Sequence, residues 1–208
     1  MNVRSSSSGV AGQSGNIRSA PPDGRLHVAI AQHSAWVARW IGQPRANARL
    51  LDFASGSGRH ARLAAARGFR VLAVDRDEAI LKMAQRKDIE VRLEDLESGR
   101  WSFSAERFEV VVVTNFLFRP RLDLLAGLLE AGGRLVYETF ALGNARYGKP
   151  SSATFLLQPD ELFLAARRAA LQVIAFEQGF VATPKPALVQ RVVAVKPPYD
   201  PESSPLVG

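Results

Sequence analysis

The residues best suited to chemistry lie in one short stretch, LLDFASGSGRHARLAAARGFRVLAVD at positions 50–75. It contains an apolar run, a group of very small residues and a second apolar run, with the acids Asp52 and Asp75 toward its two ends. Small residues between a strand and a helix expose backbone N–H groups and the positive end of the helix to a ligand. The pattern therefore predicts a binding turn rather than a plain loop.

The turn supplies Ala54, Ser55, Gly56 and Gly58 as expected backbone contacts, because a glycine lets a ligand approach where a Cβ would collide. Asp75 follows Ala54 by 21 residues. This is close to the spacing of about 20 at which an acid accepts hydrogen bonds from ribose hydroxyls. The expected ligand is therefore a nucleoside.

Two nucleoside cofactors compete for this turn. Gly56, Gly58 and Ala61 fit the dinucleotide fingerprint G-x-G-x-x-A, which would bind a diphosphate. Asp52 argues against a dinucleotide, because a carboxylate two residues before the turn would lie near the phosphates. S-adenosylmethionine has no phosphate and carries an ammonium and a sulfonium group, both of which a carboxylate stabilises. Asp52 therefore favours S-adenosylmethionine over NAD(P).

The elements that must position the turn alternate between strand and helix. Strands are expected at 49–54, 69–75, 89–93, 108–114, 134–140, 171–177 and 187–195, and helices at 59–67, 77–86, 122–129 and 159–170. The alternation predicts an α/β fold, with a doubly wound, mostly parallel seven-stranded sheet and ligands at the carboxyl ends of its strands. The last two strands have no helix between them, so they must form an antiparallel C-terminal pair.

A helix-like stripe over 25–43, with a possible break at His33 and Ser34, predicts one helix or two short ones. His33 and Trp36 could form a lid over the cofactor, although Trp36 and Trp40 fit better as a buried face. Residues 1–24 are rich in Ser and Gly without an apolar core, so we expect a disordered arm and no secretory signal. Residues 197–208, rich in proline, are expected to form a flexible tail.

The composition suits a single domain over 25–196, since the chain has 208 residues of which 47% are hydrophobic. The absence of cysteine excludes disulfides and thiolate chemistry, and three scattered histidines predict no metal site. A net charge of +7 is compatible with nucleic acid, but the arginines are spread among acids, which favours a small-molecule partner. No apolar run is long enough to span a membrane. We expect a cytoplasmic monomer or homodimer.

The stretch LLDFASGSGRHARLAAARGFRVLAVDRD resembles motif I and the following acidic motif of class I S-adenosylmethionine-dependent methyltransferases. That family has the pattern acid-x-Gly-x-Gly-x-Gly, which Asp52, Ala54, Gly56 and Gly58 fill with alanine in place of the first glycine. The likeness covers residues 26–196 and is nearest to small bacterial members similar to the tellurite-resistance methyltransferases. It implies a Rossmann-like fold, S-adenosylmethionine as cofactor and methyl transfer as the activity.

The resemblance also implies cofactor contacts outside the turn. Asp75, with Arg76 directly after it, would hold the ribose. Asp95 and Leu96 would border the adenine, and Asn115 would lie beneath the methionine moiety. For Asp95 the alternative is a solvated acid on a loop.

Methyl transfer from a sulfonium is an in-line displacement, so the protein mainly aligns the reactants and excludes water. Residues 137–159, YETFALGNARYGKPSSATFLLQP, make a long connection that is expected to form one wall of the acceptor pocket. Glu138, as a possible general base, and Tyr147 are the catalytic candidates there. The alternative for Glu138 is an ion pair with Arg146 or Lys149.

The segment TNFLFRP lacks the Asn/Asp-Pro-Pro-aromatic signature of methyltransferases that hold a flipped base. Phe116 and Phe118 could stack on a planar substrate, although core packing suits each better. The expected function is methyl transfer from S-adenosylmethionine to a small molecule. The alternatives are an RNA methyltransferase, or an NAD(P)-binding oxidoreductase or regulatory module that uses the same turn.

Overall fold

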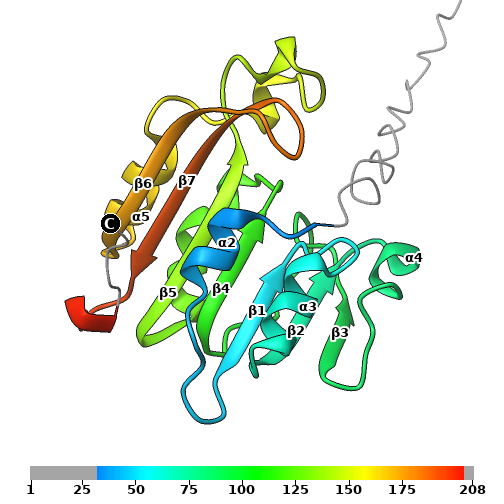
Figure 1. The fold of residues 1–208 in the computed structure, drawn as a ribbon, viewed down its shortest axis with the longest axis vertical. Coiled ribbons are helices and arrows are strands. Elements are labelled where there is room, and N and C mark those ends of the chain that lie inside the picture. The colour runs from blue at the N-terminus through cyan, green and yellow to red at the C-terminus, as the bar shows by residue number, and fades with distance from the viewer. Residues whose placement is uncertain (1–31, 204–208) are drawn as a thin grey trace, which may run out of the picture.

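The computed structural model describes residues 32–203 and contains a seven-stranded sheet in the order β3-β2-β1-β4-β5-β7-β6 (Figure 1). β1 to β5 run parallel, and β7 pairs antiparallel with both β5 and β6. The predicted fold class and the antiparallel terminal pair are confirmed. The expected arm at 1–24 lies outside the described residues. The strands are β1 (Arg49–Phe53), β2 (Arg70–Asp75), β3 (Ile89–Leu93), β4 (Phe108–Thr114), β5 (Leu129–Phe140), β6 (Gln172–Val181) and β7 (Ala187–Val195).

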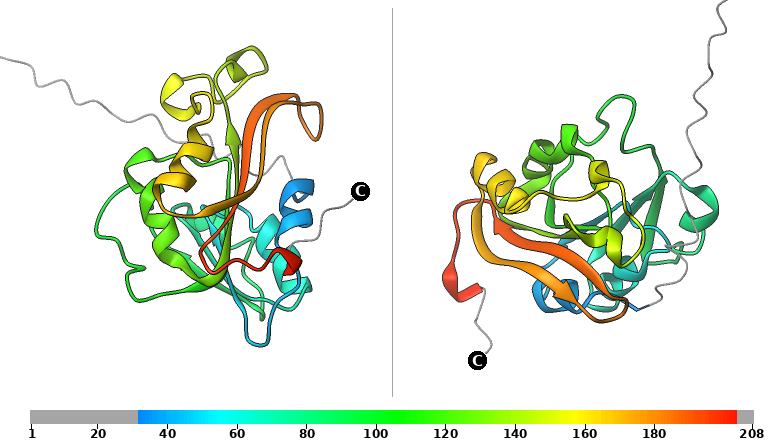
Figure 2. Two further views of the ribbon diagram at one scale, coloured as in Figure 1. Left: turned by 90° about the vertical axis from the view of Figure 1, so that its left-hand side faces the viewer. Right: turned by 90° about the horizontal axis from the view of Figure 1, so that it is seen from above.

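Helices cover both faces of the sheet. Seen edge-on, α2 and α3 lie on one side of it and η1 and α5 on the other (Figure 2). This three-layer arrangement leaves the carboxyl ends of the parallel strands uncovered by helices, as in other doubly wound folds. The helices are α2 (Ala35–Trp40), α3 (Arg59–Ala66), α4 (Glu78–Leu81) and α5 (Glu161–Arg168), with 3-10 turns η1 (Arg119–Leu128), η2 (Asn144–Arg146), η3 (Ala153–Phe155) and η4 (Pro201–Ser203).

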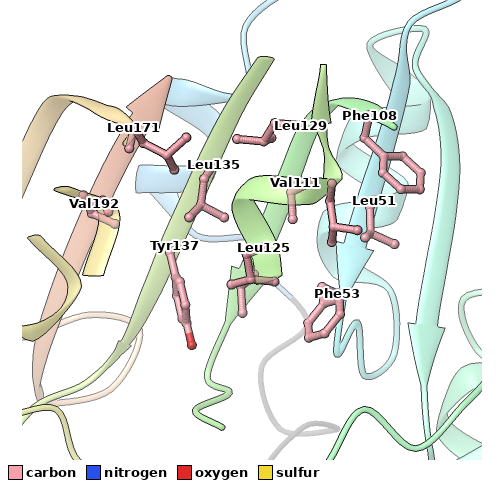
Figure 3. Close-up of a cluster of buried hydrophobic side chains, with 14 of the residues drawn as sticks. Leu51, Phe53, Phe108, Val111, Leu125, Leu129, Leu135, Tyr137, Leu171 and Val192 are labelled. Atoms are coloured by element: carbon pink, nitrogen blue, oxygen red, sulfur yellow. The ribbon is translucent and has the colours of Figure 1, made fainter. Parts of the chain in front are cut away.

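Each face of the sheet has its own apolar core, because successive side chains of a strand point to opposite faces. In β1, Leu51 joins the cluster beneath η1 and α5, whereas Leu50 joins the cluster beneath α2 and α3. Figure 3 shows part of the first cluster, in which Leu125 of η1 approaches the strand residues. Burial on both faces explains why the central strands read as continuous apolar runs.

The expected helix at 77–86 is wrong in extent, since α4 ends at Leu81. Asp77 caps its start by accepting the N–H groups of Ala79 and Ile80. After Lys82 the backbone N–H groups bond to carbonyls three residues back rather than four. These tighter turns bring Ala84, which is fully buried, against the turn after β1.

The helix expected at 122–129 is present as the 3-10 helix η1, which begins at Arg119 and ends at Leu128. The leucines that it packs against the core are Leu122, Leu125 and Leu128, and Ala126 adds a smaller contact. The leucines' spacing of three matches the three residues per turn of a 3-10 helix. The spacing of these leucines therefore indicates a 3-10 helix. The assumption of 3.6 residues per turn, as in an α-helix, hides this signal.

The strand expected at 134–140 begins earlier, at Leu129. Gly132 and Gly133 lie inside β5 at a register shift against β4. Gly132 has a φ of 74°, which a glycine adopts without strain. The pair therefore forms a bulge in the strand rather than a helix end.

The hairpin and the chain ends differ in smaller ways. β6 continues four residues past the expected end at 177, and η4 occupies part of the expected tail. The expected interruption at His33 and Ser34 is the start of α2, where Ser34 is the N-cap; the part of that stripe before residue 32 lies outside the described residues. Among residues 32–203, no helix combines the length and the apolar character that crossing a membrane requires.

Candidate active site

The turn after β1 is built from backbone in the left-handed region. Ala54, Gly56 and Gly58 have φ values of 58°, 53° and 74°. Gly58 is the N-cap of α3 and has no side chain to cap the helix. Asp52, near the end of β1, supplies the missing cap instead, because its Oδ2 accepts the N–H of Ala61 at 2.9 Å. A strand residue therefore fixes the start of the helix against the sheet.

Gly58 is required for a reason other than the expected approach of a ligand. A Cβ at this position would lie 2.3 Å from the Cβ and 2.9 Å from the Cα of Ala84. The second contact is with backbone, so side-chain rotation cannot relieve it. The glycine thus permits close packing of the turn against the segment after α4.

We predict that Gly58→Ala lowers the free energy of unfolding by about 3 kcal/mol, through left-handed strain and the contact with Ala84. Gly99→Ala is the matched control, since Gly99 has a similar φ of 68° but nothing within 4 Å of the place where a Cβ would lie. It should cost about 1 kcal/mol from strain alone. Urea denaturation of both variants measures the difference, and equal losses would show that the contact with Ala84 is unimportant.

Asp75, at the end of β2, holds the other side of the turn. Its Oδ2 accepts the backbone N–H of Gly56 at 2.8 Å, and its Oδ1 accepts the N–H of Asp77 at 3.0 Å. The first of these bonds joins the ends of β1 and β2, which are neighbours in the sheet. Asp75 therefore shapes the binding turn as well as facing the space beside it.

That space is a cleft at the carboxyl ends of β1, β2 and β4, here called the acidic cleft. Six of the predicted cofactor residues line it: Ala54, Asp75, Arg76, Asp95, Leu96 and Asn115. Asp77, Ile80, Glu97 and Phe116 complete the lining. Ser55, Gly56, Gly58 and Asp52 are not among the lining residues. They lie in and below the turn, so their contact with a cofactor stays a prediction.

The acidic cleft carries more negative than positive charge. Asp75, Asp77, Asp95 and Glu97 line it, and its single cationic lining residue, Arg76, forms an ion pair with Glu97. Asp95 accepts hydrogen bonds from Glu97 N–H and Ser98 Oγ, both at 2.9 Å, and the first of these is the main reason why its pKa is lowered. The cleft is therefore suited to a cation and unsuited to a diphosphate.

Asp52 lies behind the turn and is 1% exposed. Its Oδ1 has no hydrogen-bond partner among the described residues. Burial raises the pKa of Asp52 to about 7, although the bond from the Ala61 N–H and the charge of Arg59 oppose this. A buried carboxylate with one unpartnered oxygen is costly for folding, and it attracts any positive charge placed nearby.

A second and larger space, here called the basic cavity, adjoins the first. Its volume is about 390 Å³, and both Glu138 and Tyr147 line it. Asn115 lines both the acidic cleft and the basic cavity, so the two spaces meet at the end of β4. Asn144, Tyr147 and Lys149 show that the expected segment 137–159 does contribute one wall.

Glu138 is paired with Arg191 of β7 rather than with Arg146 or Lys149, the partners considered as the alternative to a general-base role. Arg191 Nε lies 2.6 Å from Glu138 Oε2, and Ser34 Oγ donates to the same oxygen at 3.1 Å. Arg191 also lies 3.3 Å from Glu177 and above the ring of Trp36. The Glu138 carboxylate is thus engaged in holding two other segments in place.

The sequence analysis did not identify several residues of this region as part of a site, including Ser34, Arg59 and Arg191.

The buried ring of His60 links two segments of the chain, since its Nε2 accepts the Ser34 N–H at 3.1 Å and its Nδ1 lies 3.3 Å from Thr114 Oγ1. Burial, helped by the charge of Arg59, lowers the pKa of His60. The neutral ring therefore joins the start of α2 to the end of β4.

The residues considered for a lid or for stacking on a substrate lie in different parts of the structure. Trp36 is buried and lies 5.7 Å from Trp40, so it belongs to the core, whereas His33 lines the basic cavity. Phe116 lines the acidic cleft, and Tyr137 Oη holds its carbonyl at 2.8 Å. Phe118 is not among the lining residues of either space. Tyr147 lines the basic cavity and packs against Phe180, with tilted rings whose centroids are 5.2 Å apart.

Comparison with known proteins agrees with this geometry. Residues 50–133, which include the binding turn and Asp75, match a family model described as a methyltransferase domain. No curated protein sequence matches the chain. The structure of TehB from Haemophilus influenzae is similar, with 16% identity and a TM-score of 0.60 over 72% of this chain. The match covers 58% of the length of that protein.

Two further structures cover most of both chains. A TehB-like SAM-dependent methyltransferase from Corynebacterium glutamicum has 21% identity and a TM-score of 0.59, and covers 83% of this chain and 93% of its own. The YcgJ protein from Bacillus subtilis has 15% identity and a TM-score of 0.61, and covers 79% and 99%. At these identities the likeness concerns the fold.

Proposed function

We propose that this chain is a class I S-adenosylmethionine-dependent methyltransferase and that it methylates a small molecule bound in the basic cavity. The match of residues 50–133 to a methyltransferase domain and the likeness in fold to a TehB-like SAM-dependent methyltransferase support this proposal. S-adenosylmethionine supplies a methyl group on a sulfonium, which makes the carbon electrophilic. In the transfer, the acceptor would form a bond to that carbon as the carbon–sulfur bond broke, and the electron pair of the broken bond would stay on sulfur. The chain's own residues bind, orient and exclude water.

The observation that carries the proposal is the charge of the acidic cleft. Four carboxylates line it, and its one cationic residue, Arg76, is paired with Glu97. A cofactor with positive charge and no phosphate is stabilised there, whereas the diphosphate of NAD(P) would be repelled. The unpartnered Oδ1 of buried Asp52 adds a further negative group behind the turn.

The proposed contacts follow the lining of the acidic cleft. Asp75 and Arg76 hold the ribose, and Asp95 and Leu96 border the adenine. The small residues of the turn, Ala54 to Gly58, lie against the methionine end, with Asp52 behind them. Asn115 stands where the two spaces meet, so it contacts the methionine end and lies beside the transferred methyl group.

The basic cavity supports the choice of a small acceptor. Its volume of about 390 Å³ is in the range of sites that enclose small molecules, roughly 300–1,000 Å³. Tyr147 contributes an aromatic wall. Glu138 positions Arg191 and Ser34 in this proposal rather than removing a proton, because its Oε2 is already in contact with both of these partners.

Calorimetric titration tests the cofactor assignment. The full chain is expected to bind S-adenosylmethionine and S-adenosylhomocysteine at least about tenfold more tightly than NAD or NADP. Release of S-adenosylhomocysteine is then followed with small-molecule mixtures and with total RNA as acceptors. Tighter binding of a dinucleotide would contradict the cofactor, and turnover with RNA alone would contradict the acceptor.

A further inference from the structure

We infer that the methyl acceptor is an anion, whose carboxylate or phosphate group is held by Arg59 in the basic cavity. The inference rests on the proposed function of that cavity. It adds a chemical class of substrate, which neither the fold nor the family match specifies.

Arg59 is the first residue of α3, and its side chain enters the basic cavity. Its Nη1 donates to the carbonyl of Gln32 at 3.0 Å, and no carboxylate of residues 32–203 forms an ion pair with it. Arg59 is half-buried, and this burial lowers its pKa. A cation that is partly removed from water and unpaired gains most from an anionic ligand with matching geometry.

Glu138, which lines the same cavity, does not neutralise Arg59. Glu138 attracts its charge, but the Oε2 of Glu138 is already bound by Arg191 at 2.6 Å and by Ser34 at 3.1 Å. Glu138 is also the single carboxylate in the described lining, which contains Lys185 and Arg191 in addition to Arg59. The cavity therefore keeps an excess of positive charge.

The two adjoining spaces have opposite charge, and this matches the two reactants. The acidic cleft suits a cationic methyl donor, and the basic cavity suits an anionic acceptor. Because Asn115 lines both, an acceptor whose acid group lies at Arg59 can extend toward the methyl group. The apolar lining by Phe140, Val181, Pro184 and Val189 fits the remaining body of such a molecule.

The test uses the full chain saturated with S-adenosylhomocysteine and titrated with benzoate, benzamide and phenyl phosphate. These probes have one aromatic body and differ in their charge. Benzoate or phenyl phosphate is expected to bind at least about tenfold more tightly than neutral benzamide. Whichever of benzoate and phenyl phosphate binds more tightly shows whether the recognised group is a carboxylate or a phosphate.

Arg59→Gln is expected to reduce the preference for the anion to about threefold or less. Arg70→Gln is the matched control, because Arg70 is exposed and begins β2 at the opposite end of the strand, so it should leave the preference unchanged. Lys185→Gln, at an exposed lining position, should weaken the anion about threefold without any risk to folding.

The outcomes separate the inference from the proposed function. If S-adenosylhomocysteine does not bind, the proposed function fails. If it binds but benzamide equals the anions, or if none of the three probes binds, the inference alone is overturned. An unchanged preference in Arg59→Gln would also overturn it.

Discussion

Asp75→Asn is expected to lower the affinity for S-adenosylhomocysteine by about a hundredfold. The Asp75 carboxylate accepts two backbone N–H groups, from Gly56 at 2.8 Å and from Asp77 at 3.0 Å. A hydrogen bond to a charged group contributes about 1.5–3 kcal/mol, and an amide can accept through only one atom. Its NH₂ group would instead face one of these N–H donors.

The loss should appear in calorimetric titration at pH 7.5, since about 2.7 kcal/mol corresponds to a hundredfold change in affinity. Asp88→Asn is the control, because it removes the same charge from an exposed turn outside both lined spaces. It should leave the affinity within about threefold. If the Asp75→Asn protein folds and binds S-adenosylhomocysteine as tightly as the parent, Asp75 neither shapes the turn nor contacts the ribose.

The sheet could be predicted largely from the sequence because its strands are buried on both faces. The ranges 89–93, 108–114 and 187–195 are found with the predicted ends, and the last pair had to be antiparallel because no helix joins it. Buried strands read as apolar runs bounded by polar or turn residues. This signal is local, so a single sequence suffices to find it.

The segments that connect the strands were harder to predict, because their conformation depends on contacts between residues that are distant in the sequence. α4 ends early where Ala84 packs beneath Gly58, some 26 positions away in the chain. Gly132 and Gly133 have the appearance of a helix end, but they form a bulge against β4. Glycine indicates unusual backbone without saying which element contains it.

The site likewise has one part that the local sequence predicts and another that depends on distant contacts. The turn and Asp75 lie within one contiguous unit of strand, helix and strand, where spacing alone relates them. The basic cavity is assembled from Ser34, Arg59, Glu138 and Arg191, which come from four separate elements. Nothing in the local sequence marks these four as neighbours. Glu138 was therefore identified as important, but its partner Arg191 was missed.

Asp52→Asn is expected to remove a large pH dependence of stability. Burial raises the pKa of Asp52 to about 7 in the folded chain. In the unfolded chain the value is near about 3.9. Between these two values the folded state retains a proton that the unfolded state has released. Stability therefore falls as pH rises through this window, by about 1.4 kcal/mol per pH unit and on the order of 4 kcal/mol in total.

The asparagine variant has no such titration, so the difference between the two proteins should change with pH. At about pH 4 the protonated acid and the amide are similar in shape and charge, and the stabilities should lie close together. At about pH 8 the variant should be the more stable, by several kcal/mol. Urea denaturation of both proteins without cofactor measures this, and taking the difference cancels the other titrating groups. A constant difference across this range would show that Asp52 does not titrate there.

A carboxylate that destabilises the fold should have a use in binding. Its charge lies behind the turn that we propose for the methionine end, where the sulfonium of S-adenosylmethionine would stabilise it. Binding of that cofactor should therefore release a proton, and its affinity should rise with pH through about 7. Asp52→Asn should abolish this rise and weaken S-adenosylmethionine about tenfold, while S-adenosylhomocysteine, which lacks the sulfonium charge, loses less. Equal losses for the two ligands would show that Asp52 acts only by holding α3 through Ala61.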